Sequence, residues 1–396
     1  MTFTLEDIHD AYRRFKSYVY YDNSNLHLRY KIAEFETKEL NGKLQNLCVA
    51  LNRFCDGKEG EDIDSWIREG SYIILPKSEE GKQIDNGDVC ILTNKSEKTS
   101  FGISKVAVLY DGPIELFIIA TIWTVRVNPY LHISADSYGY VLPSSKHSRL
   151  LYEPYFRKYQ EWRDKGINAA KQQIEQGNNV LFITLDIKNY FHSVQVDFRQ
   201  LKSFIPKKDN QVAKLTDIIE QICIDHTKKV YGPQKHIHSI LPIGLPSSGV
   251  IANWILSDFD KDIKNSTAPV YYGRYVDDIF LVVANVEPPT KDIIQWMCER
   301  FFSKCDVLEK VGDNTLKIKS NRCEGLEIQK KKLRLFYFDA HWSLALLNKF
   351  QTTLQENSSA FWFLPNEEDL KDSLDDTYDL QYEDTIISLE VYLLAN

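Results

Sequence analysis

Short apolar runs separated by polar residues dominate the middle of the chain, and their lengths predict strands. Residues 181–185 (LFITL) contain β-branched side chains in an almost continuously apolar run, which is typical of a buried strand. Residues 270–275 and 279–283 form two more β-rich runs, separated by three residues, so they predict a hairpin. Residues 251–259 instead show apolar positions at four-residue spacing, which predicts a helix that ends near Ile263.

The segments before this region give a second set of predictions. Residues 114–123 (IELFIIATIW) are the most apolar stretch, but they are too short to span a bilayer and predict a buried helix. Near the N-terminus, Thr4 and Asp7 have the spacing of a capping box and predict the start of an amphipathic helix. Residues 73–77 predict a strand that ends in Pro-Lys, and the polar, turn-rich residues 78–104 predict a mobile loop.

Three acidic residues lie at the predicted ends of the central strands. Asp186 directly follows the run 181–185, and Asp277-Asp278 occupy the tip of the predicted hairpin. Adjacent carboxylates at a buried strand end repel each other and lose hydration, which is costly unless a cation neutralises them. Taken alone, Asp186 is better explained as a cap or turn residue. Together with the acidic hairpin, it predicts a site for divalent metal ions, which prefer oxygen ligands.

Three ordered motifs make the chain resemble reverse transcriptases over roughly residues 70–340. The first is Asp186, followed five positions later by Phe191. The second is the Pro-x-Gly segment at residues 242–244, with a serine and an asparagine downstream, and the third is Tyr-x-Asp-Asp at 275–278. The downstream residues are Ser248 and Asn253, which we expect to brace this segment and the helix after it.

The resemblance implies an α+β fold of the right-hand polymerase type, with fingers and a palm whose antiparallel sheet is flanked by helices. We therefore expect an N-terminal helical segment at residues 1–70, fingers and palm at 71–340, and a short helical, thumb-like and acidic region at 341–396. The implied activity is RNA-directed DNA polymerisation, a nucleotidyl transfer. Its partners are an RNA template, deoxynucleoside triphosphates and the DNA product.

The resemblance also assigns roles to the matching residues. Asp186, Asp277 and Asp278 would be catalytic and would hold two Mg²⁺ ions, with the Ile187 carbonyl as a further ligand and Mn²⁺ as an alternative ion. Phe191 would lie under the sugar of the incoming nucleotide and exclude a 2′-hydroxyl, although core packing also explains this residue.

Three further nucleotide contacts follow from the same resemblance, and clustered positive charge separately predicts a basic segment that contacts nucleic acid. Gly244 would let the backbone approach the nucleotide, while Lys77 would reach its phosphates from the fingers. Arg322 would lie close to the triphosphate, with Lys317 and Lys319 as competitors, and a solvated surface explains all of these basic residues equally well. The candidate nucleic-acid contacts are Lys330, Lys331, Lys332 and Arg334.

One departure from the family pattern keeps other functions open. Ile243 stands where many reverse transcriptases have glutamine, and an aliphatic side chain cannot hydrogen-bond the nucleotide. Template-independent or protein-primed DNA synthesis by the same palm is therefore an alternative. A non-catalytic RNA-binding subunit is a third hypothesis, which the intact set of acids disfavours.

The net charge of −8 is unusual for an enzyme that binds nucleic acid, but the acidity is local. Residues 367–396 hold ten acids and one base, so 47 basic and 46 acidic residues remain in the rest of the chain. The apolar residues at the end of this acidic segment favour docking over disorder.

The opening segment and the short acidic C-terminus resemble bacterial defence-associated reverse transcriptases, in particular the smaller enzyme of systems that pair two reverse transcriptases. This finer resemblance implies antiviral DNA synthesis on a dedicated noncoding RNA, with a second reverse transcriptase subunit or a homo-oligomer. Seven cysteines without paired spacing predict no disulfide framework, and no signal peptide or membrane segment is recognisable. We therefore expect a cytoplasmic protein.

Overall fold

The structure is a computed structural model with two compact units, which we describe separately. The units comprise residues 1–130, 147–151 and 195–250 in the first, and residues 131–146, 152–194 and 251–396 in the second. The described residues are 2–21, 25–37, 39–58, 60–79, 82–86, 89–93, 103–145, 148–232, 239–288, 293–302, 307–311, 315–341 and 347.

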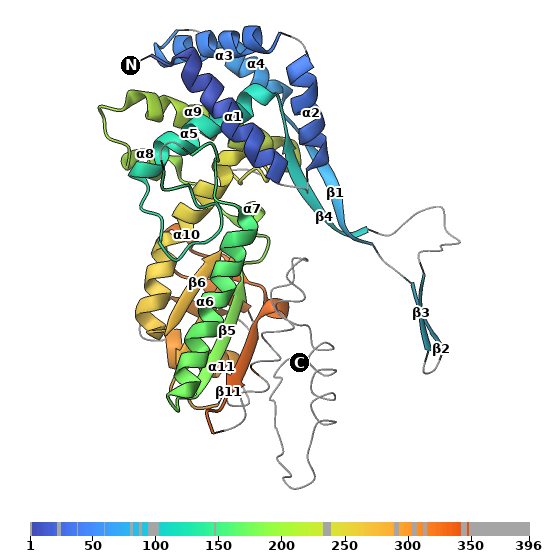
Figure 1. The fold of residues 1–396 in the computed structure, drawn as a ribbon, viewed down its shortest axis with the longest axis vertical. Helices are drawn as coiled ribbons and strands as arrows, with labels where there is room; N and C mark the ends of the chain where they lie inside the picture. The colour runs from blue at the N-terminus through green and yellow to red at the C-terminus, as the bar shows by residue number, and fades with distance from the viewer. Residues whose placement is uncertain are drawn as a thin grey trace. The chain divides into compact units, whose positions relative to one another are not determined.

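Helices make up most of the first unit (Figure 1). Its helices are α1 (Leu5–Tyr21), α2 (Leu26–Thr37), α3 (Leu40–Cys55), α4 (Glu61–Glu69), α5 (Ile114–Val127), α8 (Phe198–Ser203) and α9 (Asn210–Tyr231), with a 3₁₀ turn at Asn128–Tyr130. The capping box is confirmed, because the Thr4 N–H donates to Asp7 Oδ2 at 2.8 Å and the Asp7 N–H donates to Thr4 Oγ1 at 3.2 Å. The predicted buried helix is also confirmed, since α5 packs between α1 and α9 with nearly all of its side chains buried.

Two antiparallel pairs complete the first unit. Strand β1 (Ser71–Glu79) pairs with β4 (Ile103–Asp111), and β2 (Lys82–Asn86) pairs with β3 (Val89–Thr93). The prediction of a loop over residues 78–104 was therefore wrong for these strands. Their β-branched residues, Ile84, Val89 and Ile91, favour extended structure despite the polar neighbours.

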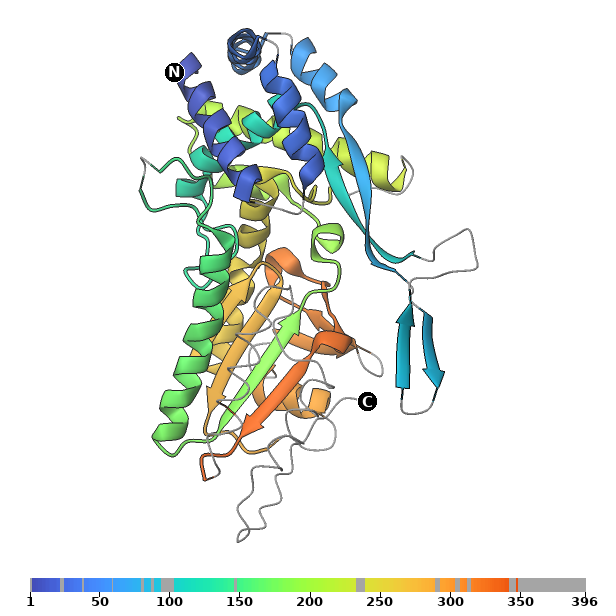
Figure 2. The same cartoon turned by 45° about the vertical axis from the view of Figure 1, so that its right-hand side comes forward.

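The second unit is built on a four-stranded antiparallel sheet of order β11-β5-β7-β6 (Figure 2). Its strands are β5 (Val180–Asp186), β6 (Tyr271–Tyr275), β7 (Asp278–Ala284) and β11 (Arg334–Phe338). Helix α6 (Tyr155–Glu175) covers one face, where Trp162 packs edge-on against Phe280, which in turn stacks on Phe182. On the opposite face, Tyr272 and Arg274 contact helix α10 (Pro246–Thr267), because alternate residues of a strand point to opposite sides. The predicted strand, hairpin and helix are all confirmed.

Smaller elements flank this sheet. They are α7 (Tyr190–Ser193), α11 (Ile293–Met297) with a π-turn at Cys298–Phe302, a three-stranded sheet of β8 (Leu308–Val311), β9 (Thr315–Ile318) and β10 (Glu327–Ile328), and 3₁₀ turns at Asn321–Cys323 and Lys330–Lys332.

The mixture of helices and antiparallel sheets agrees with the predicted α+β class. Four helices, α1 to α4, account for most of the described residues between 2 and 70, and the bounds predicted for the three regions stay predictions. The thumb-like region at 341–396, with its acidic segment, lies outside the described residues apart from His341 and Leu347. Among the helices that the structure describes, none is both long enough and apolar enough to cross a membrane.

Candidate active site

The strand register brings the predicted acidic residues together. Asp186 ends β5 and Asp278 begins β7, and the two residues are direct cross-strand partners. Asp277 precedes Asp278 in the turn, where its carbonyl oxygen accepts a hydrogen bond from the Ile187 N–H at 3.3 Å. Directly opposed residues in an antiparallel pair have neighbouring side chains on the same face of the sheet. Residues separated by about ninety positions in the chain therefore form one acidic cluster.

The turn between β6 and β7 has a conformation that β-branched residues rarely adopt. Val276 has a φ of 59°, in the left-handed region, and Tyr275 pairs directly with Asp278 across the turn. Such a backbone costs on the order of 1–3 kcal/mol and persists only when its surroundings hold it. The carbonyl oxygen of Val276 accepts a hydrogen bond from Arg274 Nη1 at 2.7 Å, which fixes the turn that carries Asp277.

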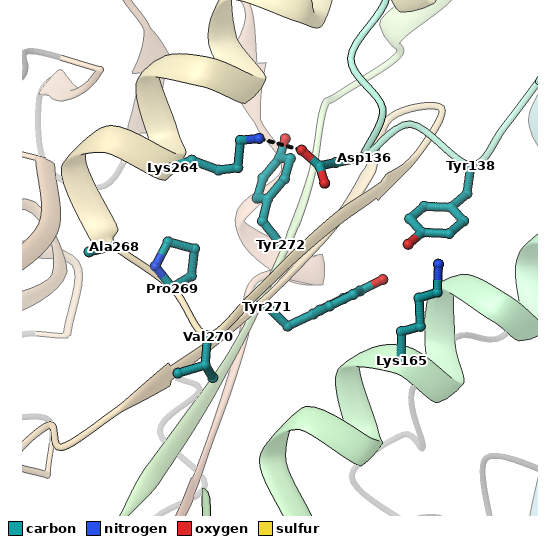
Figure 3. A pocket seen from close by; sticks show the side chains of 9 residues that line it. All are labelled: Asp136, Tyr138, Lys165, Lys264, Ala268, Pro269, Val270, Tyr271 and Tyr272. Atoms are coloured by element: carbon teal, nitrogen blue, oxygen red, sulfur yellow. Dashed lines mark hydrogen bonds and ion pairs between the residues drawn. The ribbon is translucent and has the colours of Figure 1, made fainter. Parts of the chain in front are cut away.

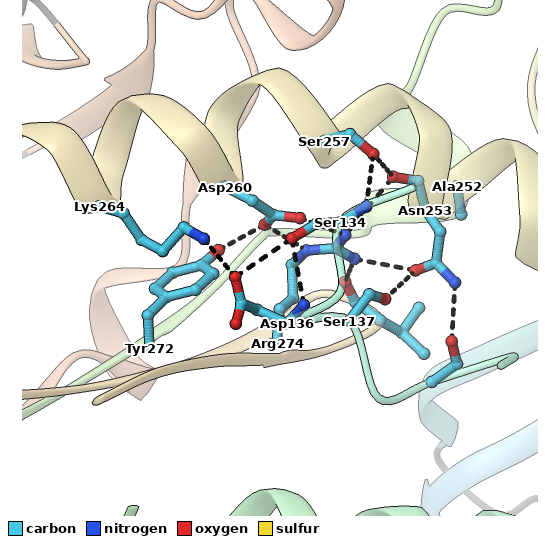
Figure 4. Close-up of polar contacts among 12 residues, drawn as sticks. Ser134, Asp136, Ser137, Ala252, Asn253, Ser257, Asp260, Lys264, Tyr272 and Arg274 are labelled. Atoms are coloured by element: carbon cyan, nitrogen blue, oxygen red, sulfur yellow. Dashed lines mark hydrogen bonds and ion pairs between the residues drawn. The ribbon is translucent and has the colours of Figure 1, made fainter. Parts of the chain in front are cut away.

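Arg274 is held in turn by a buried network with α10 (Figure 4). Its Nε and Nη2 donate to the two carboxylate oxygens of Asp260 at 2.7 and 2.8 Å, and both side chains are fully buried. Its Nη1 also donates to Asn253 Oδ1 at 3.0 Å, and the Tyr272 hydroxyl bonds the same Asp260. The bidentate pair gives the strand a fixed position on the helix.

A loop beside β6 supports the turn from its other side. The Tyr138 N–H donates to the Arg274 carbonyl, while Asn253 Nδ2 donates to the Gly139 carbonyl at 2.7 Å. A Cβ atom on Gly139 would lie 2.6 Å from Val276 Cγ2, so only glycine permits this approach. Asn253 therefore contacts the hairpin and the loop beside it, a role that we did not predict. Ser248 Oγ braces its own segment, as expected, by donating to the Pro242 carbonyl at 2.6 Å.

The electrostatics of the acidic cluster fit a cation-binding site. Burial, followed by the charges of Asp277 and Asp186, raises the pKa of the Asp278 carboxyl well above its usual range. This carboxyl also hydrogen-bonds Asp186. Carboxylate oxygens are the ligands that Mg²⁺ and Mn²⁺ prefer, and a cation would relieve the repulsion between them. Among the described residues, no three His, Cys, Asp or Glu side chains are already arranged around one metal position.

A lysine contributes a positive charge to this cluster. Lys332 Nζ lies 2.6 Å from Asp186 Oδ2. Burial disfavours its charge, but the hydrogen bond to Asp186 and the neighbouring carboxylates outweigh that effect and raise the pKa of Lys332. Lys332 thus contacts a candidate metal ligand, and its predicted contact with nucleic acid stays a prediction.

Three of the predicted nucleotide-binding residues, Phe191, Gly244 and Lys77, lie in three different segments of the structure. Phe191 is half-buried in α7, edge-on to Tyr190, five positions after Asp186. Gly244 has a φ of 94°, so glycine suits its backbone, and it belongs to the first unit. Lys77 lies in β1 of that unit, and its side chain is outside the described part. Their roles in nucleotide binding stay predictions.

Arg322 is bound to α10 in this structure. Its Nε and Nη2 contact the Asp258 carboxylate at 2.7 and 2.6 Å, its Nη1 donates to the Trp254 carbonyl, and its guanidinium stacks on the Trp254 ring. These contacts would have to break before Arg322 could reach a triphosphate, a role that stays a prediction.

The other residues of the predicted basic segment are neighbours of Lys332 along the chain. Lys330 is exposed on the same 3₁₀ turn, and the side chain of Lys331 lies outside the described part. Arg334 begins β11 and pairs with Thr184 of β5. Their contact with nucleic acid stays a prediction.

A separate pocket of about 440 Å³ lies at the other end of β6 (Figure 3). An ion pair between Lys264 and Asp136 borders it. Its lining residues are Asp136, Tyr138, Lys165, Lys264, Ala268, Pro269, Val270, Tyr271 and Tyr272. None of the candidate catalytic residues lines it.

Our sequence analysis missed three residues that organise the site, namely Arg274, Asp260 and Gly139. An arginine directly before the Tyr-x-Asp-Asp motif, and an acid within the apolar positions of α10, were the available signals. A charge in an otherwise apolar strand or helix predicts a buried partner, because an unpaired buried charge is very costly.

Comparisons with known proteins agree with this geometry. Residues 118–360, well over half of the chain, match the family described as reverse transcriptase (RNA-dependent DNA polymerase). A comparison with curated proteins finds no match. The matched segment includes all three ordered motifs and the strands that hold the acidic cluster. The chain belongs to the reverse transcriptase family and is an RNA-directed DNA polymerase, a nucleotidyltransferase.

Proposed function

We propose that Asp186, Asp277 and Asp278 are the catalytic centre of RNA-templated DNA synthesis. The observation that carries this proposal is the direct pairing of Asp186 with Asp278 at the strand ends, next to the turn that holds Asp277. Burial and the two neighbouring carboxylates raise the pKa of Asp278, so this arrangement is costly unless a cation binds there.

The proposed reaction joins the primer 3′-oxygen to the α-phosphorus of a deoxynucleoside triphosphate, while the bond to pyrophosphate breaks and the 3′-hydroxyl loses its proton. The three aspartates and the Ile187 carbonyl would hold two Mg²⁺ ions, with Mn²⁺ able to replace them. When bound, the ions supply Lewis acidity that lowers the pKa of the 3′-hydroxyl and stabilises the charge on the phosphates.

Other residues of this chain would position the nucleotide. Phe191 would pack under its sugar and exclude a 2′-hydroxyl, Gly244 would permit close approach of the backbone, and Lys77 would contact the phosphates. For these residues the support is their place in the family motifs, together with the positive φ of Gly244.

The biological setting that we propose is bacterial antiviral defence. The N-terminal segment and the acidic C-terminus resemble those of defence-associated reverse transcriptases, which supports a dedicated noncoding RNA as template or primer. A second reverse transcriptase subunit or a homo-oligomer would complete the assembly in the cytoplasm.

One residue favours an alternative chemistry. Ile243 is half-buried and cannot donate or accept a hydrogen bond through its side chain, so the nucleotide lacks the contact that glutamine would give. Template-independent or protein-primed synthesis by the same acidic cluster is therefore the second candidate function.

DNA synthesis by the purified full-length chain tests these proposals. We expect incorporation of deoxynucleotides with Mg²⁺ and RNA, and a product complementary to that RNA on sequencing. Asp186→Asn should abolish synthesis, whereas Asp62→Asn, at an exposed acid of α4, should leave it unchanged. Products unrelated to the RNA would instead support the alternative, and unchanged synthesis by Asp186→Asn would refute the proposed centre.

A further inference from the structure

Lys332 contacts the carboxylate of Asp186, a proposed metal ligand. Its ammonium contacts Asp186 Oδ2 at 2.6 Å, and only 6% of the Asp186 side chain is exposed. The ammonium therefore occupies one of the two carboxylate oxygens through which Asp186 could bind another cation. The contact joins residues that are 146 positions apart in the chain.

The main chain places Lys332 there by two connections to the end of β5. The Gln329 N–H donates to the Asp186 carbonyl at 2.7 Å, and Ile328 forms a β-bridge with Ile187. On the other side of Lys332, strand β11 pairs with β5 from Arg334 onward, opposite Thr184. The 3₁₀ turn that carries Lys332 is therefore attached to the Asp186 strand at both of its ends.

The lysine side chain can nevertheless leave this position without disturbing the core. It is 56% exposed, and four rotatable bonds separate the ammonium from the backbone. A single ion pair with one exposed partner is weak, whereas a divalent ion gains several carboxylate ligands in the same cluster. The arrangement favours exchange of the lysine for a stronger cation.

We propose that Lys332 is a resident counter-ion of the catalytic cluster that competes with the divalent metal for Asp186. This inference rests on the proposed function, because it takes Asp186 as a metal ligand. Lys332 neutralises Asp186 until a divalent ion displaces the ammonium. The lysine therefore raises the concentration of divalent ion that is needed to fill the site. It is a positioning residue rather than a catalytic one.

Binding of Mn²⁺ to the full-length chain, followed by the electron paramagnetic resonance signal of the free ion, tests this competition. Lys332→Met should lower the dissociation constant of the Asp186-dependent site roughly two- to fivefold, the range that corresponds to loss of a weak ion pair. Lys330→Met removes the same charge from the same turn and should change the constant much less. Lys332→Arg keeps the charge and should not tighten binding.

Two results would overturn this inference and leave the proposed function standing. Mn²⁺ binding that Asp186→Asn abolishes but that Lys332→Met leaves unchanged or weakens would overturn only the role of Lys332. An equal gain in Lys330→Met would also overturn it, because general surface charge would then explain the effect. Absence of any Asp186-dependent Mn²⁺ binding in the unmodified chain would overturn both. A cooperative thermal unfolding transition of the Lys330 and Lys332 variants would show that they are folded.

Discussion

At the scale of single residues, the Asp278 carboxylate is electrostatically costly to bury in this site. Its pKa is raised by burial and by two neighbouring carboxylates, while a single lysine only partly offsets the effect. A protein keeps such a residue at the expense of stability where its chemistry requires it. Activity and stability should therefore respond in opposite directions when this charge is removed.

Asp278→Asn should increase stability at neutral pH while it removes activity. The raised pKa means that Asp278 favours folding most below its unfolded pKa of about 3.9 and loses that contribution as pH rises through the folded pKa. Asparagine does not titrate. In chelator-containing buffer, the free energy of unfolding of the variant should therefore rise relative to that of the unmodified chain as pH increases. We expect a gain on the order of 1–2 kcal/mol at pH 7.5 by urea unfolding, and at least a roughly hundredfold loss of synthesis.

The matched control is Asp62→Asn, which removes one exposed charge. At each pH, its free energy of unfolding should stay within about 0.5 kcal/mol of that of the unmodified chain. Asp278→Asn that is less stable than the unmodified chain at pH 7.5 would contradict our assignment of electrostatic cost to this residue.

Phe191 should control the choice between deoxyribonucleotides and ribonucleotides. Phe191→Val would open space for a 2′-hydroxyl, and we expect the preference for deoxynucleotides to fall roughly 10- to 100-fold, the range for one lost steric contact. Single-nucleotide incorporation with each triphosphate measures this ratio.

Tyr190→Phe is a suitable comparison for Phe191→Val. It keeps the adjoining ring and removes only the buried hydroxyl that donates to the Ala252 carbonyl at 2.7 Å, so it should cost about 1 kcal/mol of stability without changing sugar preference. An unchanged preference in Phe191→Val would leave core packing as the role of Phe191.

At the scale of elements, the hairpin of β6 and β7 depends on its attachment to α10. Arg274→Met should destabilise the protein by about 3–5 kcal/mol, because the Asp260 carboxylate would stay buried without its partner. The change also removes the donor to the Val276 carbonyl, so synthesis should fall as well. Urea unfolding and primer extension measure the two effects.

A triple variant can separate the stability role of Arg274 from its positioning role. Tyr272→Phe, Asp260→Leu and Arg274→Met together replace the buried polar network by apolar side chains, which should recover most of the lost stability. The Val276 turn would still lack its donor, so synthesis should stay low. Recovery of synthesis with stability would show that Arg274 acts on stability alone.

The elements themselves were largely predictable, because local patterns specify them. The apolar run before Asp186 and the β-rich runs around Asp277-Asp278 gave the strands, and the four-residue spacing in α10 gave the helix. What the sequence did not reveal depends on pairing between distant segments. Lys332 reaches Asp186 only because β11 pairs with β5, and Arg274 meets Asp260 only because α10 lies on that face of the sheet.

At the scale of the whole molecule, the uneven distribution of charge should govern how the protein binds RNA. The chain carries a net charge of −8, and ten of its acids lie in residues 367–396, beside a single base. The remaining residues are close to neutral, with local basic segments. An acidic segment can weaken RNA binding by general repulsion, or it can compete with RNA by docking on a basic surface of its own chain.

Replacing the ten acids of residues 367–396 by asparagine and glutamine would change the net charge from −8 to +2. At about 0.1 M salt we expect this variant to bind single-stranded RNA several-fold more tightly in fluorescence anisotropy, with the difference disappearing near 0.5 M salt as charges are screened. A variant with the same residues in shuffled order keeps the charge but loses any specific docking sequence. If repulsion governs binding, the shuffled variant should behave like the unmodified chain, whereas docking would make it resemble the neutralised variant. Since the apolar residues at the end of this segment favour docking, we expect the shuffled variant to bind RNA more tightly than the unmodified chain, and equal affinities would contradict docking.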